Sequence, residues 1–432
     1  MRPATLLLWL LLGWAAIGAA MLAGALPFWS WVMAGAGVLV AACIDLLRLR
    51  RLPSPEVQRE LPEALALGVR REVTLRLHST RAMTVAVFDL VPGAWHCEGL
   101  PRRLSLVPDS VRHFHYNVVP HQRGAFRFEG THVRLRSPWR LWWQQRTLAP
   151  ALDVRVFPNF VPLTRFALSS AEQASRMVGA HLKRRRGEGT DFNQMREYRV
   201  GDSLRQIDWK ATSRARRLVS REYQDEKNQQ MLLVIDTGRR MMASDGGLSH
   251  FDHVLNATLV VAYLALRQGD GVGLFATGGD ARWVAPKRGM GTIDDLLRAS
   301  HDLQPQPVAT DYLAAATELS LRQRRRALVM LVTNVRDEDI EDLLAAVKLL
   351  QRRHLVCVAS LREQVLDRVL DTPVETLEEA TGAAAAALYL EQRAQAHEAL
   401  RSHGVVVLDV TADALPGALV ERYLAVKRGG LL

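Results

Sequence analysis

The sequence predicts a multi-domain, membrane-anchored protein with two N-terminal transmembrane helices, an antiparallel β-sandwich-like domain and a doubly wound α/β domain. Three patterns carry this prediction. They are a charge-free run from Pro3 to Ile44, apolar residues with period two between residues 68 and 158, and buried strands alternating with amphipathic helices after residue 228. The predicted domains are 1–51, 52–160, 161–228 and 229–432.

The charge-free run has room for two membrane-spanning helices, at roughly residues 4–24 and 28–47, because one span needs about 20 apolar residues. A cleaved signal peptide followed by one anchor is the alternative, since small residues lie between the two stretches. Arg48, Arg50 and Arg51 follow the second stretch, and an excess of Lys and Arg marks the cytoplasmic flank of a span. We therefore expect a protein of the inner (cytoplasmic) membrane whose soluble domains face the cytosol.

The middle of the chain shows a strand pattern. Val73, Leu75 and Leu77 alternate with polar residues, and the same alternation recurs between turns up to residue 158. Short strands spaced by turns are typical of an antiparallel sandwich. Three tryptophans near its end are interpreted as core or membrane-proximal residues: Trp139, Trp142 and Trp143.

A basic connector follows. Between Lys183 and Glu222 there are twelve Lys and Arg against six Asp and Glu, so a net +6 of the total +11 lies in this short stretch. Aromatic residues are interleaved with the charges, which a disordered tail would lack. The stretch is either an ion-paired connector, with Arg196, Arg205 and Arg214 pairing with Glu197, Asp202, Asp208 or Glu222, or a docking surface for a partner or an anion. The candidate binding residues are Asp191, Arg196, Tyr198, Asp202, Arg205, Asp208, Trp209 and Arg214.

Beyond the connector, apolar runs predict parallel strands and the segments between them predict helices. The predicted strands are 231–236, 271–276, 326–333, 354–360 and 404–410. The predicted helices are 249–266, 291–303, 311–323, 338–352 and 382–402. In such sheets the ligand crevice lies at the carboxyl ends of the strands.

Catalytic signatures are absent from the sequence: it contains no phosphate-binding GxxxxGK[ST], no GxSxG, no HExxH and no CxxC. His250 and His253 are three residues apart, but no further ligand accompanies them, so they are interpreted as a surface pair and not as half of a zinc site. We therefore predict no enzyme activity and no cofactor.

The segment GEGTDFNQMREYRVGDSLRQIDWKATSRARRLVSREYQDE resembles the signature of the DUF58 proteins. The matching positions are Gly189, Arg196, Tyr198, Gly201, Asp202, Arg205, Ile207, Trp209, Arg214, Arg221 and Glu222. The resemblance implies that the α/β domain is of the von Willebrand factor A-like (vWA-like) type. It also implies a partner, a AAA+ ATPase of the MoxR type, with which such proteins are thought to assemble or mature other proteins.

The vWA-like resemblance further implies a place for a divalent ion, held by D-x-S-x-S, a Thr and a second Asp. This chain offers Asp236 and Thr310, but Gly238, Arg240 and Asn334 stand at the other three positions. The site is thus a degenerate one, and we expect no metal to be required.

Two arrangements around Asp236 remain open. A guanidinium from Arg240 or Arg239 takes the place of the ion, or both arginines point to solvent and the crevice is vestigial. Asp311 is the one nearby carboxylate that could restore metal binding.

Taken as a whole, the sequence favours a membrane-anchored, cytosol-facing protein-binding module, inserted in the lipid bilayer through residues 4–47, with an unknown client protein. An enzyme acting on a phosphate-bearing substrate through the Asp and Arg residues of 191–208 is the alternative. Binding of anionic lipid or nucleic acid by the basic connector rests on charge alone, and nucleic acid is the less favoured of these ligands.

Overall fold

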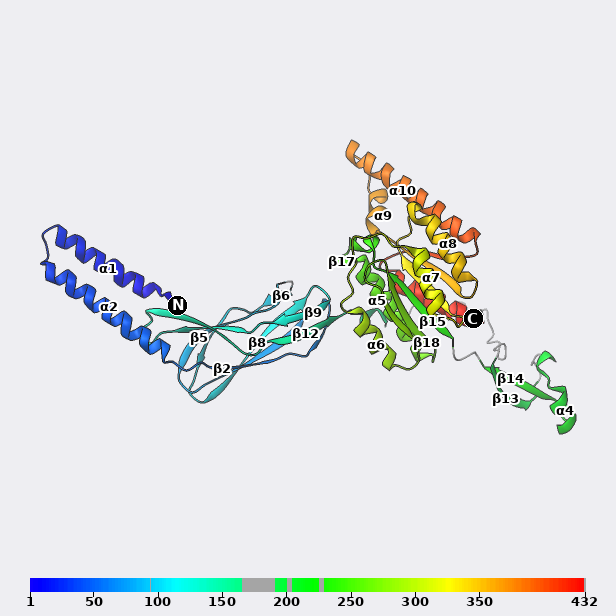
Figure 1. Cartoon of the computed structure of the whole chain (residues 1–432), viewed down its shortest axis with the longest axis horizontal. Coiled ribbons are helices and arrows are strands. Elements are labelled where there is room, and N and C mark those ends of the chain that lie inside the picture. The colour runs from blue at the N-terminus through cyan, green and yellow to red at the C-terminus, as the bar shows by residue number, and fades with distance from the viewer. Residues whose placement is uncertain (94, 165–190, 200–203, 225–228, 431–432) are drawn as a thin grey trace. The chain divides into compact units, whose positions relative to one another are not determined.

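The computed structural model describes residues 1–93, 95–164, 191–199, 204–224 and 229–430. The chain divides into two compact units, Met1–Phe157 and Pro158–Leu432, and each is described by itself (Figure 1).

The first unit begins with two long apolar helices, α1 (Thr5–Leu22) and α2 (Phe28–Arg50). By length and composition both are able to cross a membrane. Trp14 and Trp31 stack with their ring centroids 5.0 Å apart, which joins the two helices. The prediction of two N-terminal apolar helices is confirmed, and the second continues to Arg50, past the predicted end at residue 47.

The rest of the first unit consists of strands in three sheets. The sheet orders are β1-β11-β10-β5-β7, β2-β4-β8-β6 and β3-β12-β9. Their bounds are β1 Arg2–Pro3, β2 Glu56–Glu60, β3 Ala64–Ala66, β4 Arg71–Ser79, β5 Met83–Asp89, β6 Trp95–Glu98, β7 Arg102–Leu106, β8 Ser110–Pro120, β9 Gly124–Phe128, β10 Thr131–Arg136, β11 Trp142–Leu148 and β12 Leu152–Phe157. The pairings are antiparallel except that between β3 and β12, whose long separation along the chain permits a parallel pair. Val73, Leu75 and Leu77 are fully buried, as their alternation with polar residues predicts.

The second unit is built on a six-stranded sheet of order β19-β18-β15-β20-β21-β22. The strands are β15 Gln230–Asp236, β18 Gly271–Thr277, β19 Arg282–Lys287, β20 Leu328–Thr333, β21 Leu355–Arg362 and β22 Val406–Thr411. All neighbours are parallel except β18 and β19. β19 was not among the predicted strands, because its residues show little apolar alternation.

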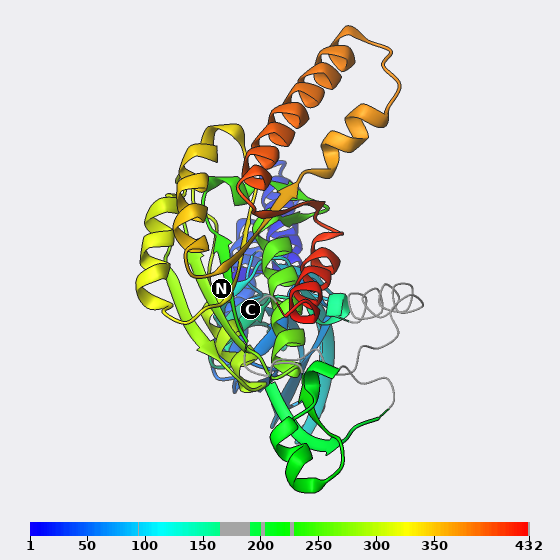
Figure 2. The ribbon, with the colours of Figure 1, turned by 90° about the vertical axis from the view of Figure 1, so that its right-hand side faces the viewer.

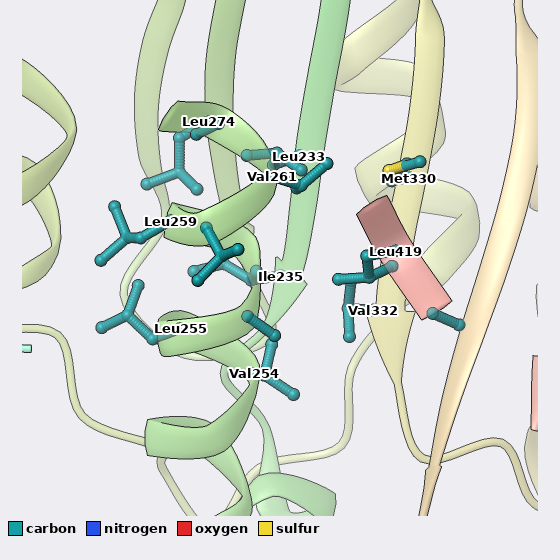
Figure 3. Close-up of a cluster of buried hydrophobic side chains, with 14 of the residues drawn as sticks. Leu233, Ile235, Val254, Leu255, Leu259, Val261, Leu274, Met330, Val332 and Leu419 are labelled. Carbon is teal, nitrogen blue, oxygen red and sulfur yellow. The ribbon is translucent and has the colours of Figure 1, made fainter. Parts of the chain in front are cut away.

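Helices cover both faces of this sheet. One face packs on α5 (His250–Arg267), α6 (Gly291–Ser300) and α11 (Leu415–Arg428). The other packs on α7 (Tyr312–Arg322), α8 (Ile340–Gln351) and the second half of α10 (Leu377–Ser402). Figure 3 shows Val254, Leu255 and Leu259 of α5 beside Leu233 and Ile235 of β15. The continuous apolar sequence of β15 follows from this burial on both sides.

Two smaller features complete the second unit. The first half of α10 and the short α9 (Gln364–Asp371) form an arm that projects from the rest of the α/β fold (Figure 2). The connector contains a hairpin of β13 (Asp191–Glu197) and β14 (Val219–Gln224), with η1 (Leu204–Gln206) and α4 (Trp209–Ala215) between the strands.

Candidate functional site

Asp236 ends β15 at the carboxyl edge of the parallel sheet and is fully buried. Its Oδ1 accepts hydrogen bonds from Gly238 N (2.7 Å) and Thr310 Oγ1 (2.5 Å). Its Oδ2 accepts from Thr333 Oγ1 (2.6 Å) and Tyr312 Oη (3.1 Å). A carboxylate offers about four lone-pair positions, so these four donors engage its acceptor capacity in full.

The hydroxyl of Tyr312 is held in its protonated form. Burial, and then the charge of Asp236, raise the pKa of Tyr312 well above its usual value. The phenol therefore remains a donor to Asp236 throughout the physiological pH range.

Glycine is required at position 238 by the approach of other atoms. A Cβ at Gly238 would overlap Thr310 Oγ1 and would lie 2.8 Å from the carbonyl oxygen of Val308. A Cβ at Gly278 would likewise overlap Thr310 Oγ1, and Gly278 has a φ of +110°, which side chains rarely adopt. The space that a side chain at position 238 would need is thus occupied by Thr310, Val308 and Asp236.

The structure places Arg240 away from both expected arrangements. Arg240 lies in η2 (Arg239–Met242), and its side chain is only 10% exposed, so it does not point to solvent. Its Nε and Nη2 donate to Asp339 Oδ2 at 3.1 and 2.9 Å, and Nη2 also bonds Glu338. Burial by itself would lower the pKa of Arg240, but the two carboxylates outweigh it and raise that pKa. The hydroxyl donors, and not a guanidinium of Arg240, surround Asp236.

Arg239 and Asp311 also have partners away from Asp236. The Arg239 guanidinium is half exposed and lies 3.5 Å from Glu338. Asp311 is the N-cap of α7 and accepts from Ala314 N at 2.7 Å. The Asp311 carboxylate is therefore hydrogen-bonded to the first turn of its own helix.

Asn334, at the position of the second vWA aspartate, takes part in a separate network. Its Oδ1 accepts from Arg393 Nη1 (2.5 Å), and its Nδ2 donates to Glu363 Oε1 (2.8 Å). The Arg393 guanidinium also bonds Ser360 Oγ at 2.5 Å and Asp409 Oδ1 at 3.0 Å. One cation of α10 therefore ties together residues at the ends of β20, β21 and β22.

Sequence reasoning missed Arg393. The available signal was its spacing from Ala396 and Leu400, which places all three on one face of the helix. That face is buried, and the Arg393 side chain is 1% exposed.

A groove of about 770 Å³ opens beside this site along α7. Thr310 lies at its end, and Asp342, which accepts from Tyr312 N at 2.7 Å, lines it. The exposed Leu321 borders the groove farther along the helix. Among the described residues, no group of three or more His, Cys, Asp or Glu is placed to hold a metal ion. The interpretation of His250 and His253 as a surface pair was wrong for His250, which is fully buried at the start of α5, while His253 is half-buried.

Asp208 of the connector has a partner that the sequence did not predict. Asp208 is nearly buried, caps α4 by accepting from Ala211 N (2.9 Å), and receives Arg221 Nη2 (2.7 Å) and Nε (2.8 Å). The Ala211 hydrogen bond, followed by the Arg221 bond, lowers the pKa of Asp208. Asp208 thus pairs with Arg221, which was not among the three arginines that we expected.

The remaining predicted connector residues lie as follows. The Arg196 guanidinium donates to the backbone carbonyl of Glu197 at 3.2 Å, and Tyr198 N donates to Leu218 O at 2.9 Å. Trp209 is 68% exposed at the start of α4, and Arg214 is exposed in its last turn. Asp202 lies outside the described residues, as do the side chains of Asp191 and Arg205.

Comparison with known proteins gives a family match and a distant relative. Residues 194–403 match the family model described as "Protein of unknown function DUF58". The Bacillus subtilis (strain 168) "Uncharacterized protein YeaD" is 23% identical over 353 residues, which cover 77% of this chain and 85% of YeaD.

Solved structures give weaker likenesses. The BatB protein of Bacteroides thetaiotaomicron matches with a TM-score of 0.31 and 14% identity, over 46% of this chain and 99% of BatB. The Escherichia coli alpha-2-macroglobulin matches with a TM-score of 0.19 and 14% identity, over 24% of this chain. That match spans only 6% of the macroglobulin.

Proposed function

We propose that the chain, whose residues 194–403 match the DUF58 family model, is a membrane-anchored module that binds a cytosolic partner protein. By the resemblance of its signature, the partner is a AAA+ ATPase of the MoxR type, acting in the assembly or maturation of a client protein. In this proposal α1 and α2 cross the inner membrane. Arg48, Arg50 and Arg51 flank the cytosolic end of α2, so both soluble regions face the cytosol.

The arm formed by α9 and the first half of α10 is the observation that carries the proposal. It exposes large apolar side chains: Val365 (55%), Leu370 (43%), Val374 (51%), Leu377 (82%) and Leu388 (57%). Contiguous exposed apolar surface marks a site of protein interaction. Apolar side chains that stabilise the fold itself are buried within it, whereas these five are exposed.

The charge on the arm indicates the character of the partner surface. Asp371, Glu375, Glu378 and Glu379 lie at its tip, in a chain whose net charge is +11. Glu379 also closes a capping box with Thr376, so the start of α10 is well defined. A complementary partner presents an apolar patch bordered by Lys or Arg.

The Asp236 site supports binding better than catalysis. Every oxygen of the carboxylate is engaged by a hydroxyl or a backbone N–H, which fixes the loops at the carboxyl edge of the sheet. Asp208, one of the acids of the alternative phosphate-binding enzyme, is likewise engaged by Ala211 and Arg221. We therefore propose no catalytic residue.

Copurification tests the proposal. The full-length chain is purified from gently solubilised native membranes, and the eluate is searched by mass spectrometry for a MoxR-type ATPase. A Leu377→Ser, Leu388→Ser variant is expected to lose at least nine-tenths of the ATPase, about 1.4 kcal/mol of binding free energy. The matched control is Leu321→Ser, which changes a leucine that is 73% exposed on α7.

Three outcomes are informative. Retention of the ATPase by the arm variant contradicts docking at the arm. Loss in the Leu321→Ser control alone transfers the docking site to the groove along α7. Absence of any such ATPase from the wild-type eluate contradicts the partner.

The proposed topology has its own test. Reporters fused after Arg51 and after Leu432 are expected to be active only as cytosolic reporters. A signal from a periplasm-active reporter at the C-terminus contradicts the orientation.

A further inference from the structure

Asp45 is a fully buried carboxylate near the end of the apolar helix α2. Three donors reach it from the loop between β10 and β11, residues 137–141. Its Oδ2 accepts from Ser137 Oγ (2.5 Å) and Leu141 N (3.2 Å), and its Oδ1 accepts from Trp139 N (2.9 Å). The 137–141 loop thus donates three hydrogen bonds to Asp45, which is the one acidic residue before Glu56 in the sequence.

Further contacts fix the same loop to both apolar helices. Trp142 Nε1 donates to the carbonyl of Ala42 at 2.9 Å, and Ala4 N donates to the carbonyl of Leu141 at 2.8 Å. Leu7, Ala42 and Leu141 pack together as a small core. The loop therefore belongs to the same rigid unit as the helices.

The position of Asp45 along α2 sets the depth of the loop. Asp45 lies seventeen positions after Phe28 in α2, which is about 25 Å of helix at 1.5 Å per residue. The hydrocarbon core of a bilayer is about 30 Å thick. Ile44 and Leu47 remain exposed beside Asp45, so the apolar surface of α2 continues to the level of the loop. A helix that spans from Phe28 consequently brings the loop to the cytosolic margin of the hydrocarbon.

The side chains that the loop exposes suit that depth. Trp139 is 42% exposed, and the Arg48 guanidinium lies 4.7 Å from its ring centroid. Arg140 is exposed beside it. No acidic residue occurs between Thr131 and Leu148, so the charged side chains of this hairpin are all basic. Trp and Arg are the residues typical of the membrane interface.

We propose that the 137–141 loop is a lipid-binding site at the membrane interface. Trp139 lies at the boundary between headgroups and acyl chains, and Arg48 and Arg140 bind the phosphates of phospholipid headgroups. The site rests on the proposed membrane insertion of α1 and α2 and extends it. The sandwich domain itself contacts the bilayer, and Asp45 holds it there.

Nitroxide depth measurements on the full-length chain in phosphatidylethanolamine–phosphatidylglycerol nanodiscs test the depth. In a background with Cys43, Cys97 and Cys357 changed to Ala, one cysteine is introduced by Trp139→Cys. The substitution keeps the backbone N–H that binds Asp45. The label is expected to collide with oxygen severalfold more, relative to a water-soluble nickel chelate, than a label introduced by Glu129→Cys at the opposite end of β10.

A label introduced by Leu39→Cys, at a position that is 65% exposed in the middle of α2, reports the bilayer itself. If that label is lipid-like while the label at position 139 is as water-exposed as the one at 129, the interface site is overturned and the anchor stands. If the label at position 39 is also water-exposed, the membrane insertion of α2 is overturned.

Spin-labelled phosphatidylglycerol tests the headgroup contacts. The Arg48→Gln, Arg140→Gln variant is expected to reduce the motionally restricted lipid fraction severalfold. Arg134→Gln, which removes an exposed arginine from the middle of β10, is expected to leave it unchanged. Equal restricted fractions in the wild type and in both variants overturn the assignment of Arg48 and Arg140.

Discussion

The Arg393 guanidinium donates to the side-chain oxygen of Asn334 over 2.5 Å, at the carboxyl edge of the parallel sheet. This contact joins α10, the helix whose first half forms the exposed arm, to the end of β20. The side-chain amide of Asn334 therefore binds a cation that comes from another element.

Replacement of Arg393 by Met is expected to lower the free energy of unfolding by about 3–5 kcal/mol. Removal of one partner from a buried charged network leaves the others unpaired, here Asn334, Ser360 and Asp409. Denaturant titration of the full-length chain in detergent, followed by circular dichroism, measures the change. Arg401→Met, on the same helix with its side chain half exposed, is the control and is expected to change stability by less than about 0.5 kcal/mol. Equal effects of the two substitutions would contradict the assigned role of Arg393.

Gly238→Ala is expected to destabilise the fold by about 1–3 kcal/mol or more, because the added methyl group overlaps Thr310 and the Val308 carbonyl. The same reason makes serine unsuitable at this position. Gly382→Ala in α10 is the matched control, since no atom lies within 4 Å of its added Cβ. In a helix interior, alanine in place of glycine stabilises by roughly 0.5–1 kcal/mol. Thermal unfolding of both variants gives opposite shifts if the packing around Gly238 is as described.

Neither Mg²⁺ nor Mn²⁺ is expected to bind at Asp236, because hydroxyl and backbone donors engage both carboxylate oxygens. Titration calorimetry of the full-length chain with each ion is the measurement. Micromolar affinity that disappears in Asp236→Asn but persists in Asp337→Asn would refute this expectation. Asp337 is a suitable control because it lies in the nearby acidic turn Asp337–Asp339.

Stability is expected to fall as the pH is lowered from about 6.5 to about 4. Burial, followed by the charge of Arg393, lowers the pKa of His397 to about 4, whereas an unfolded histidine has a pKa near 6.5. In this window the unfolded chain binds a proton that the folded chain does not, so the free energy of unfolding decreases as the pH falls.

His397→Gln is expected to reduce that decrease by roughly 1–3 kcal/mol. Denaturant titrations at several pH values measure it, and the exposed His403→Gln serves as the control. Burial also lowers the pKa of His250 and His354, which adds to the slope in the same direction. An unchanged slope in His397→Gln would show that His397 has the same pKa in the folded and the unfolded chain, contrary to this expectation.

Much of the fold could be predicted from local sequence patterns. The spacing of apolar residues in each element shows whether one of its faces is buried or both are. β15 is apolar at consecutive positions because helices cover both faces of its sheet, and β4 alternates because one of its faces is exposed. The short β19 and the parallel pair of β3 and β12 could not be predicted, because pairing between distant segments leaves no periodic signal in either one.

The candidate site was predictable in its location and not in its contacts. The position of Asp236 at a strand end follows from the apolar run that precedes it. Its partners Thr310, Tyr312 and Thr333 come from segments 74 to 97 residues away, and no local pattern relates them to Asp236. The pairing of Arg240 with Glu338 and Asp339 is equally distant, which explains why the expected guanidinium beside Asp236 was wrong.

The sequence by itself determined the apolar helices, the strand-rich region, the alternating α/β region and the family signature. These features depend only on the types and spacing of residues within one segment, so the periodicity of its apolar residues is enough to predict them. Only the tertiary structure decided which polar groups meet, because a buried carboxylate such as Asp45 or Asp236 is satisfied by whichever donors folding brings to it. For Asp45 those donors come from a loop more than 90 residues away, and for Asn334 the decisive cation comes from α10.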